Sequence, residues 1–380
     1  MFMEIYVVKE GDSLDGIAAS YEVDTADIAY DNQIPEPYRL AVGQAVLIPV
    51  ETEVRQKRIV RVNGYAYPYI RDEVLSETLP YLTSISVFSY GFTTNGDLIP
   101  PQVDDSRIIS AAWEQDTAPI LVLTPFDETG MFNNYLISEI THNMEAQQNL
   151  IDQMFQTMEN KGFAGIDIDF EYILPQDRVP YADFVANVRN QAAPKGYPVS
   201  VALAPKTSAN QKGLLYEGKD YQLLGAAADS VLLMTYEWGY TYGPPMAVAP
   251  VNKVREVVEY AVTEIPAEKI DLGIPNYGYD WTLPFVQGTS RARTVGNSEA
   301  VQLAVENDAV IRFDEIAMSP FFRYEKDGVQ HEVWFEDVRS MREKFGLITE
   351  YGLRGMGYWQ VMKLFRANWL LLADTFDIVK

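Results

Sequence analysis

Cysteine is absent from the 380 residues, and histidine occurs only twice, as His142 and His331. Without cysteine the chain can form no disulfide, no thiolate zinc site and no cysteine nucleophile. Two histidines are too few for a histidine-rich metal site, and they argue against a Ser-His-Asp triad. We therefore expect no metal and no cofactor.

Positive charge is also scarce. Lys and Arg together number 30 against 54 Asp and Glu, which leaves a net charge of −24. A field of this sign repels phosphate backbones and anionic lipid surfaces. We therefore expect no nucleic acid and no membrane among the partners.

A secretion signal is the third thing missing. The N-terminus, Met1-Phe2-Met3-Glu4, has neither the basic stretch nor the apolar stretch of a signal peptide. No apolar run in the sequence is long enough to span a bilayer. The sequence therefore predicts a protein that does not leave the cell by the usual signal route.

Aromatic residues, in contrast, make up 12% of the chain, with 24 Tyr and 6 Trp. Most rings are expected in the core or on the surface, but sugar-binding enzymes also use rings as platforms. A chain of this length is too long for one small domain and can bury a large core.

The most informative stretch is Gly165–Glu171, where apolar and acidic residues alternate as in a β-strand. One face carries Ile166, Ile168 and Phe170, and the other carries Asp167, Asp169 and Glu171. Carboxylates about 7 Å apart on one strand face repel one another and push their pKa values apart. A solvated face or a Mg²⁺ or Ca²⁺ site could also carry acids. A solvated face usually includes Lys or Thr, however, so the pattern favours acid–base catalysis.

The first fifty residues form a separate βααβ unit. Strands are expected at 5–8 and 45–49, and helices from the Gly11-Asp12-Ser13 turn to Tyr21 and over 25–31. The pattern Tyr6-x-Val8-x-x-Gly11-Asp12-Ser13-Leu14, with Asn32-x-Ile34 and Gly43-Gln44-x-Val46-x-Ile48-Pro49, resembles the LysM family. The resemblance implies a module over residues 1–50 that binds polymers containing N-acetylglucosamine, either peptidoglycan or chitin. The alternative is a small domain kept for packing or protein contact.

In the LysM family the sugar lies between two loops. The resemblance implies that the corresponding residues here are Gly11, Asp12, Ser13, Leu14, Asn32, Gln33, Ile34 and Pro35. Residues 51–57, charged and nearly free of large apolar groups, are expected to form a short linker.

From residue 58 onward strand and helix signals alternate. The candidate strands are residues 59–63, 84–90, 120–124, 165–171, 199–204, 231–236, 270–275 and 355–359. Eight strands, each followed by a helix, predict an α/β fold, a closed (β/α)8 TIM barrel over residues 58–380. The segment 280–335 is too long for one crossover and predicts a small α+β insertion after the seventh strand. Active sites of such barrels lie at the C-terminal ends of the strands, which brings Glu171, Tyr236, Tyr277 and Trp359 to one mouth.

These residues resemble glycoside hydrolase family 18, the chitinase-like barrels. Gly165–Glu171 is similar to the D-x-x-D-x-D-x-E signature, Met234-Thr235-Tyr236-Glu237 to the M-x-Y-D segment, Gly357-Tyr358-Trp359 to the last strand, and Val62-Asn63-Gly64-Tyr65 to the first. The chain departs from the pattern at Ala164, at Glu237 and at Leu123-Thr124-Pro125-Phe126, where the family has Asp, Asp and S-x-G-G. With the LysM unit and the missing signal, these departures resemble spore cortex-lytic N-acetylglucosaminidases.

The resemblance implies a substrate-assisted, retaining mechanism. Glu171 would be the general acid and then the general base, and Asp169 would stabilise the oxazolinium and share a proton with Asp167. Tyr236 would orient the acetamido group, and Trp359 would form the floor under the sugar. Tyr65, Met234, Glu237 and Tyr277 are further expected to contact substrate.

The predicted function is hydrolysis of spore cortex peptidoglycan after N-acetylglucosamine, by a protein of the spore coat, cortex or cell wall. Three alternatives stay open: a chitinase or other endo-N-acetylglucosaminidase, a carbohydrate-binding protein with a silent barrel, and a structural protein of the spore coat. A solution test of turnover separates the enzymes from the last two.

Overall fold

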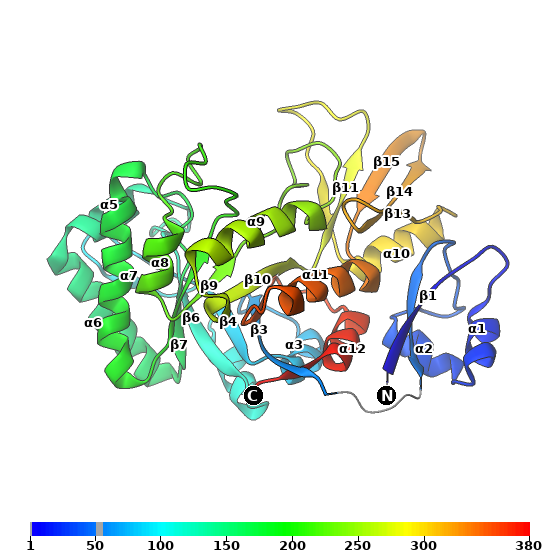
Figure 1. Cartoon of the computed structure of the whole chain (residues 1–380), viewed down its shortest axis with the longest axis horizontal. Helices are drawn as coiled ribbons and strands as arrows, with labels where there is room; N and C mark the ends of the chain where they lie inside the picture. Colours follow the sequence, from blue (N-terminus) through cyan, green and yellow to red (C-terminus); the bar gives the residue numbers. More distant parts are fainter. Residues whose placement is uncertain (1, 51–55) are drawn as a thin grey trace.

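The computed structural model describes residues 2–50 and 56–380, with the side chain of Phe2 left out. Most of the predicted linker, residues 51–55, lies outside the described residues. The chain forms a small N-terminal unit, a large barrel and an insertion that stands above one side of the barrel (Figure 1).

The N-terminal unit has the predicted βααβ order. Strands β1 (Phe2–Val7) and β2 (Ala45–Val50) pair antiparallel, and helices α1 (Leu14–Tyr21) and α2 (Thr25–Asp31) lie between them. The Ser13 hydroxyl caps α1 by accepting from the Gly16 N–H at 3.1 Å. A small core of its own includes Ile17, Ile28 and Val46.

Eight parallel strands close into the predicted barrel. They are β3 (Arg58–Ala66), β4 (Ser84–Phe92), β6 (Ala118–Leu123), β7 (Gly165–Ile168), β8 (Val199–Leu203), β9 (Ser230–Leu233), β10 (Ile270–Pro275) and β16 (Gly355–Trp359). Pairing of β3 with both β4 and β16 closes the ring. Short β5 (Leu98–Ile99) and β17 (Phe376–Ile378) extend it.

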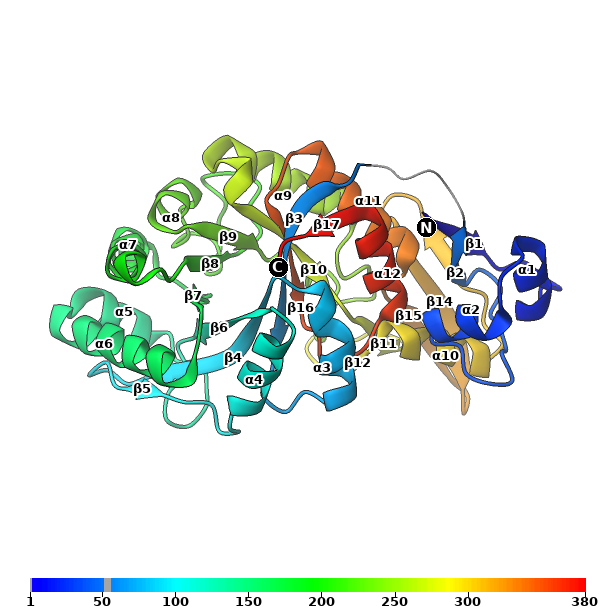
Figure 2. The same ribbon diagram turned by 90° about the horizontal axis from the view of Figure 1, so that it is seen from below.

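Helices surround the ring, as the view from below shows (Figure 2). They are α3 (Asp72–Thr78), α4 (Ser106–Glu114), α5 (Tyr135–His142), α6 (Met144–Lys161), α7 (Arg178–Ala192), α8 (Tyr221–Ala227), α9 (Val251–Glu264), α11 (Val338–Glu350) and α12 (Arg366–Thr375). Their apolar stripes, such as Met154 and Met158 of α6, are fully buried against the strands. Four 3-10 turns, η1 to η4, lie at Leu79–Tyr81, Pro175–Asp177, Ala193–Lys195 and Ala267–Lys269.

The insertion after the seventh barrel strand is an α+β piece, as predicted. Strands β11 (Gly278–Thr282), β12 (Arg293–Val295), β13 (Arg312–Asp314), β14 (Ser319–Lys326) and β15 (Val329–Trp334) form one antiparallel sheet with α10 (Asn297–Glu306) beside it. The sheet starts only three residues after β10, so it rises directly from the barrel mouth.

Two predicted strands end three residues earlier than expected, and β6 and β8 end one residue early. β7 stops at Ile168 and not at Glu171, and β9 stops at Leu233 and not at Tyr236. β8 pairs with β7 only as far as Ile168, although the Asp169 N–H still donates to Leu123 O at 2.9 Å. Asp169, Glu171 and Tyr236 therefore follow the ends of the strands and lie at the rim of the barrel.

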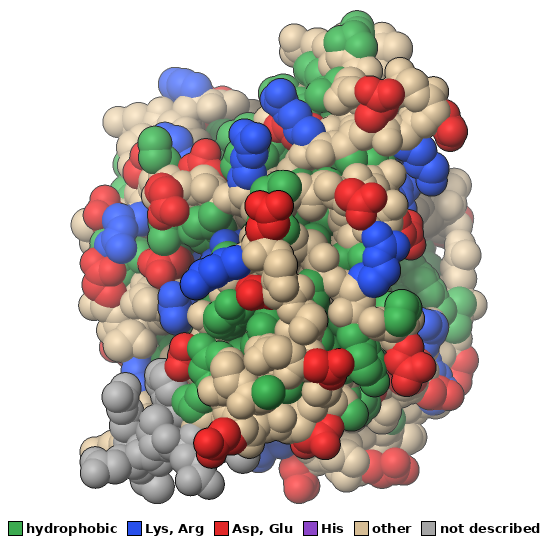
Figure 3. Space-filling model, turned by 90° about the vertical axis from the view of Figure 1, so that its right-hand side faces the viewer, with side chains coloured by type: hydrophobic (Ala, Val, Ile, Leu, Met, Phe, Trp, Pro, Cys, Tyr) green, Lys and Arg blue, Asp and Glu red, His purple; other side chains and the backbone are tan. Residues whose placement is uncertain are grey.

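The N-terminal unit packs directly against the barrel. Arg366, at the start of α12, binds both carboxylate oxygens of Glu77 at 2.7 and 2.8 Å, and its guanidinium lies 3.7 Å from the ring centre of Tyr30. The Ile311 N–H donates to Val42 O at 2.9 Å. Acidic, basic and hydrophobic side chains are interspersed on this end of the molecule (Figure 3). None of the described helices combines the length and the apolar character needed to cross a bilayer.

Candidate active site

Asp167 is held from two sides at the base of the barrel mouth. Its Oδ2 accepts from the Tyr65 hydroxyl at 2.8 Å and its Oδ1 from Ser200 Oγ at 2.6 Å. Burial raises the pKa of this carboxyl, and the two hydrogen bonds oppose that rise. Asp167 therefore has both oxygens occupied and faces no open space.

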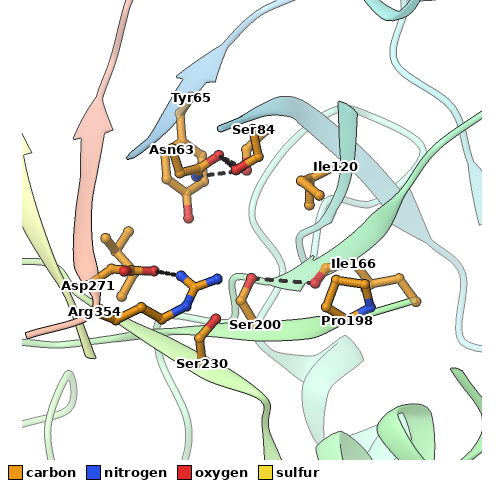
Figure 4. Close-up of a pocket in the computed structure, with 12 residues that line it drawn as sticks. Asn63, Tyr65, Ser84, Ile120, Ile166, Pro198, Ser200, Ser230, Asp271 and Arg354 are labelled. Atoms are coloured by element: carbon orange, nitrogen blue, oxygen red, sulfur yellow. Dashed lines mark hydrogen bonds and ion pairs between the residues drawn. The ribbon is translucent and has the colours of Figure 1, made fainter. Parts of the chain in front are cut away.

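Polar side chains, among them Tyr65 and Ser200, the two partners of Asp167, gather inside the barrel (Figure 4). A cavity of about 60 Å³ is lined there by Asn63, Tyr65, Ser84, Ser86, Ser200, Ser230, Asp271 and Arg354, among others. The Asp271 carboxylate pairs with Arg354, and burial still raises the pKa of Asp271 to about 6. The cavity is large enough for a few water molecules, which its polar lining could bind.

Asp169, two residues farther along the chain, lies at the barrel mouth, where it lines a cavity. It is 5% exposed, and its Oδ1 is buried with no hydrogen-bond partner among the described residues. Burial raises its pKa well above the usual value, and the charges of Glu171 and Asp167 raise it further. A buried carboxylate oxygen without a partner is costly, and it is available to accept a hydrogen bond from a ligand.

Glu171 lies at the wall of the main cavity. This cavity measures about 670 Å³ and is lined by Asp169, Glu171, Tyr172, Pro205, Leu215, Tyr216, Met234, Tyr236, Glu237, Trp238, Tyr240 and Trp359. Burial raises the pKa of Glu171, and the charge of Lys219 opposes that rise. A carboxyl with a raised pKa in a ligand-sized cleft can act as a general acid near neutral pH.

Tyr236 is brought to the same wall by the end of β9. Thr235 fixes this turn by donating its hydroxyl to Gly273 O at 2.7 Å. A Cβ at Gly273 would lie 2.1 Å from Leu233 O and 2.9 Å from the Tyr236 ring, so only glycine allows this approach. Burial raises the phenol pKa of Tyr236 well above 10, which keeps its hydroxyl a hydrogen-bond donor.

Glu237 also borders the main cavity, but its carboxylate is occupied. Tyr277 donates to Oε1, and Tyr279 lies 2.9 and 3.1 Å from the two oxygens. Its backbone adopts a left-handed conformation, with φ of 68°. Two phenols, Tyr277 and Tyr279, thus hold Glu237 in place, and Tyr277 itself is not among the residues that line the main cavity.

Trp359 ends β16 at the centre of an aromatic group. Its ring lies 4.9 Å from Phe88, 5.7 Å from Tyr65 and 6.3 Å from Tyr67. Phe88 and Tyr67 also line a second cavity of about 320 Å³. Trp359 therefore lines the acid-lined cavity and packs against two rings that line the aromatic cavity.

The structure brings together all the barrel residues singled out from the sequence. Glu171, Asp169, Tyr236, Met234, Glu237 and Trp359 line one cavity, Tyr65 reaches Asp167, and Tyr277 reaches Glu237. Three neighbours were missed: Ser200, Tyr279 and Lys219. Ser200 and Tyr279 could have been found from their strand positions beside the acids, whereas the loop that carries Lys219 has no recognisable pattern.

The predicted LysM sugar-binding residues have structural partners here. Leu14 and Ile34 are in the core of the unit, Ser13 caps α1, and Asp12 accepts from Tyr6 at 2.8 Å and from the Lys9 N–H at 2.7 Å. The side chain of Asn32 exchanges two hydrogen bonds with the Leu47 backbone. Gln33 accepts from the Arg366 N–H at 2.8 Å, whereas Gly11 and Pro35 are exposed. Their contact with sugar stays a prediction.

The arrangement suits proton transfer to a bound ligand. Within the described residues, no three His, Asp or Glu side chains are grouped to hold a metal ion. An acid with a raised pKa, a neighbouring carboxylate with a free oxygen, and a phenol donor surround one cavity beside a tryptophan. Such groups can protonate a leaving oxygen and stabilise a positive charge that develops next to it.

Comparison with known proteins agrees with this geometry. Residues 129–363 match the family described as glycosyl hydrolases family 18, and residues 6–49 match the LysM domain. The chain is 39% identical to the "Cortical fragment-lytic enzyme" of Bacillus subtilis, with 100% of this chain and 99% of that protein covered.

Two solved structures add to the comparison. The Bacillus cereus spore cortex-lytic enzyme SleL is 34% identical, with a TM-score of 0.94 over 100% of this chain and 99% of that one. A chitinase from Chromobacterium violaceum, 24% identical with a TM-score of 0.76 over 83% of this chain and 98% of that one, shares the fold. The protein with this acid-lined barrel mouth is thus a glycoside hydrolase, and the chain belongs to glycosyl hydrolase family 18, with an N-terminal LysM domain.

Proposed function

We propose that this protein hydrolyses the glycan strands of spore cortex peptidoglycan on the reducing side of N-acetylglucosamine. The observation that carries the proposal is the likeness to the cortical fragment-lytic enzyme of Bacillus subtilis over the whole chain, LysM domain included. Glu171 and Asp169, at the cavity of about 670 Å³, supply the chemistry. The chitinases are a weaker guide to substrate, because the 24% identity of the Chromobacterium protein reflects only a common fold.

The first chemical step uses the substrate's own acetamido group. Glu171 gives its proton to the glycosidic oxygen as the C1–O bond breaks, and the acetamido carbonyl oxygen attacks C1 to form an oxazolinium ring. Asp169, with its free Oδ1, accepts from the acetamido N–H and balances the positive charge. The Tyr236 hydroxyl donates to the acetamido oxygen and orients it for attack.

The second step returns the enzyme to its starting state. Glu171, now a carboxylate, takes a proton from water as the water oxygen attacks C1 and opens the oxazolinium ring. The two displacements at C1 leave the anomeric configuration unchanged. A muramic lactam has no free N-acetyl group and cannot form the ring. The lactyl ether of N-acetylmuramate adds bulk that disfavours this sugar at the same position. N-acetylglucosamine is therefore the sugar on the cleaved side.

Mass spectrometry of cortex peptidoglycan digested by the wild type and by Glu171→Gln tests the proposal. N-acetylglucosamine should form every new reducing end in the wild-type digest, and the variant should release no product. New ends that carry N-acetylmuramate would contradict the proposal, and so would faster turnover of chitin oligomers than of lactam-containing fragments. We further propose that the protein works in the spore coat, cortex or cell wall, where this substrate lies.

The LysM domain is proposed to hold the same polymer. Among its predicted contact residues, the Gly11 turn and Pro35 are the exposed positions, while the barrel supplies a partner for Gln33. A single module contributes modest affinity and mainly raises the local concentration of substrate. Binding of peptidoglycan fragments by Glu171→Gln, with and without substitutions in the Gly11 turn, measures this contribution.

A further inference from the structure

A buried lysine lies behind the catalytic acids, and the mechanism above does not use it. Lys219 belongs to the loop between β8 and α8, is 0% exposed, and donates from Nζ to Ala202 O at 2.7 Å. Among the described residues, no carboxylate oxygen forms an ion pair with this ammonium within 4.0 Å. Because a buried charge without compensation is very costly, its balance must come from charges slightly farther away.

Those charges are the three acids of the site. Ala202, whose carbonyl oxygen binds Lys219 Nζ, follows Val201 of β8, and Val201 pairs with Ile168 of β7, between Asp167 and Asp169. The ammonium therefore lies beside the strand end that carries the acids. Asp169, Glu171 and Asp167 each favour the charged form of Lys219, while burial lowers its pKa to about 8. In return the charge of Lys219 lowers the pKa of all three carboxyls against the effect of burial. The influence of the lysine is therefore shared by the whole acidic cluster.

Other charged groups near Lys219 have partners of their own. Lys206, also buried, donates from Nζ to Lys219 O at 2.7 Å and faces the backbone of the loop. Asp220, the next residue, lies 3.9 Å from Arg178. The phenols of Tyr236 and Tyr181 adjoin the same acids, but burial keeps both neutral by raising their pKa. The acids are thus the only opposite charges shown to act strongly on Lys219.

We propose that Lys219 is a positioning residue that fixes the number of protons held by the catalytic acids. Three carboxylates and one ammonium form a neutral buried cluster when two protons are bound, one on Glu171 and one shared by Asp167 and Asp169. This is the state that the mechanism requires, because it leaves one negative charge for the oxazolinium. The inference rests on the proposed function and adds the group that sets its protonation.

Loss of the ammonium changes that balance. Without it the cluster is neutral only with three protons, so Asp169 becomes protonated at neutral pH and cannot balance the oxazolinium. Removal of a nearby opposite charge raises carboxyl pKa values by about one unit or more. Both limbs of the pH profile of kcat/KM are therefore expected to move to higher pH in Lys219→Met.

The first test compares these profiles, with soluble cortex peptidoglycan fragments as substrate, in the full-length wild type, Lys219→Met, Lys219→Arg and Lys206→Met. We expect the midpoints to rise by about one pH unit in Lys219→Met and to stay nearer the wild-type values in Lys219→Arg. Lys206→Met, the matched loss of a buried lysine in the same loop, should leave the midpoints in place. Equal loss of activity at every pH in Lys219→Met, or an equal shift in Lys206→Met, would overturn the proposal.

A second test does not depend on turnover or on the substrate. Melting temperatures of the full chain are measured at pH 6.5, where Lys219 is charged, for Lys219→Met, for Asp167→Asn and for the double variant. If the charges balance each other, the double variant melts above Lys219→Met, because it has lost one charge of each sign. If the double variant lost as much in melting temperature as the two single variants together, the charges of Lys219 and Asp167 would not balance each other. Failure of the wild type to cleave the fragments would refute the proposed function and leave this test intact.

Discussion

The hydroxyl of Tyr65, on the first barrel strand, donates a 2.8 Å hydrogen bond to Asp167, on the fourth, across the interior of the barrel. Ser200 donates to the other oxygen at 2.6 Å. Both donors favour the ionised carboxylate against burial. Together they keep the pair of aspartates from binding a second proton, which would leave no negative charge for the oxazolinium.

Tyr65→Phe is therefore expected to move the acid limb of the kcat/KM profile to higher pH. A hydrogen bond to a charged group contributes about 1.5–3 kcal/mol, which corresponds to about one pKa unit or more. The loss of activity should be about tenfold at mildly acidic pH and smaller above neutrality. Tyr67→Phe is the control, because that ring also packs on Trp359 but its hydroxyl does not bind Asp167. A uniform loss in Tyr65→Phe would contradict this role.

Glu171→Gln removes the proton donor and keeps the shape of the cavity wall. Loss of a general acid–base group lowers the rate by about 10² to 10⁴-fold, whereas binding should change little. Turnover and equilibrium binding of the same peptidoglycan fragments measure the two effects separately. A variant that turns over normally would show that another group protonates the leaving oxygen.

Glu237 offers a sharp contrast, because it lines the same cavity but has its carboxylate bound to Tyr277 and Tyr279. A carboxylate held by two phenols is poorly placed to attack C1. Glu237→Gln should therefore retain at least about tenfold more activity than Glu171→Gln, since only the latter loses the acid. If Glu237→Gln were equally inactive and accumulated no oxazolinium product, a carboxylate nucleophile would replace the acetamido group in the mechanism.

The acidic site could be predicted from the sequence because its central part lies on one strand. Alternation at Gly165–Glu171 places three acids on one face without knowledge of any other segment. The proton balance could not be predicted this way, since Ser200, which binds Asp167, and Lys219, which acts on the acids through its charge, belong to other elements. Lys219 belongs to an irregular loop between β8 and α8. Such a loop has no periodicity from which the buried side chains could be predicted.

The raised pKa values also predict how stability depends on pH. Native Asp169 and Glu171 hold protons that the unfolded chain releases above about pH 4. As the pH rises from there to the native pKa values, the unfolded state binds fewer protons than the native state, and the free energy of unfolding falls. The wild type should therefore melt at a lower temperature at pH 8 than at pH 5.

Glu171→Gln should reduce this dependence, because it cannot acquire the buried charge. Each unit by which the native pKa is raised corresponds to about 1.4 kcal/mol at high pH, so the variant should melt above the wild type at pH 8. Calorimetry at both pH values measures the difference. Glu114→Gln, at an exposed position, is the control and should follow the wild type. A Glu171→Gln protein less stable than the wild type at pH 8 would show that the buried charge of Glu171 does not destabilise the native state.

The order of elements in both domains was predictable, but the contact between them was not. Periodicity and turn residues act over a few positions, whereas Arg366 meets the backbone of Tyr30 across 336 residues of sequence. Gly43 shows the same limit: a Cβ there would lie 1.8 Å from Ile311 O. Its place in the LysM pattern gives no indication of that contact with the barrel insertion.

The contact itself leads to the last prediction. Arg366 combines a two-point ion pair to Glu77, a hydrogen bond of 2.6 Å to Tyr30 O and stacking on the Tyr30 ring, at 13% side-chain exposure. Arg366→Ala removes the hydrogen bond to Tyr30 O and the stacking on the Tyr30 ring, contacts that together contribute about 2–4 kcal/mol. The LysM domain is then expected to unfold before the barrel, so that calorimetry resolves two transitions where the wild type shows one. Arg39→Ala breaks an ion pair between the LysM domain and the barrel insertion, to Asp308, in which the side chains are 55% and 88% exposed. Because exposed pairs contribute about 0–1 kcal/mol, this control should keep the single transition. Equal behaviour of the two variants would mean that the stacked guanidinium does not hold the domains together.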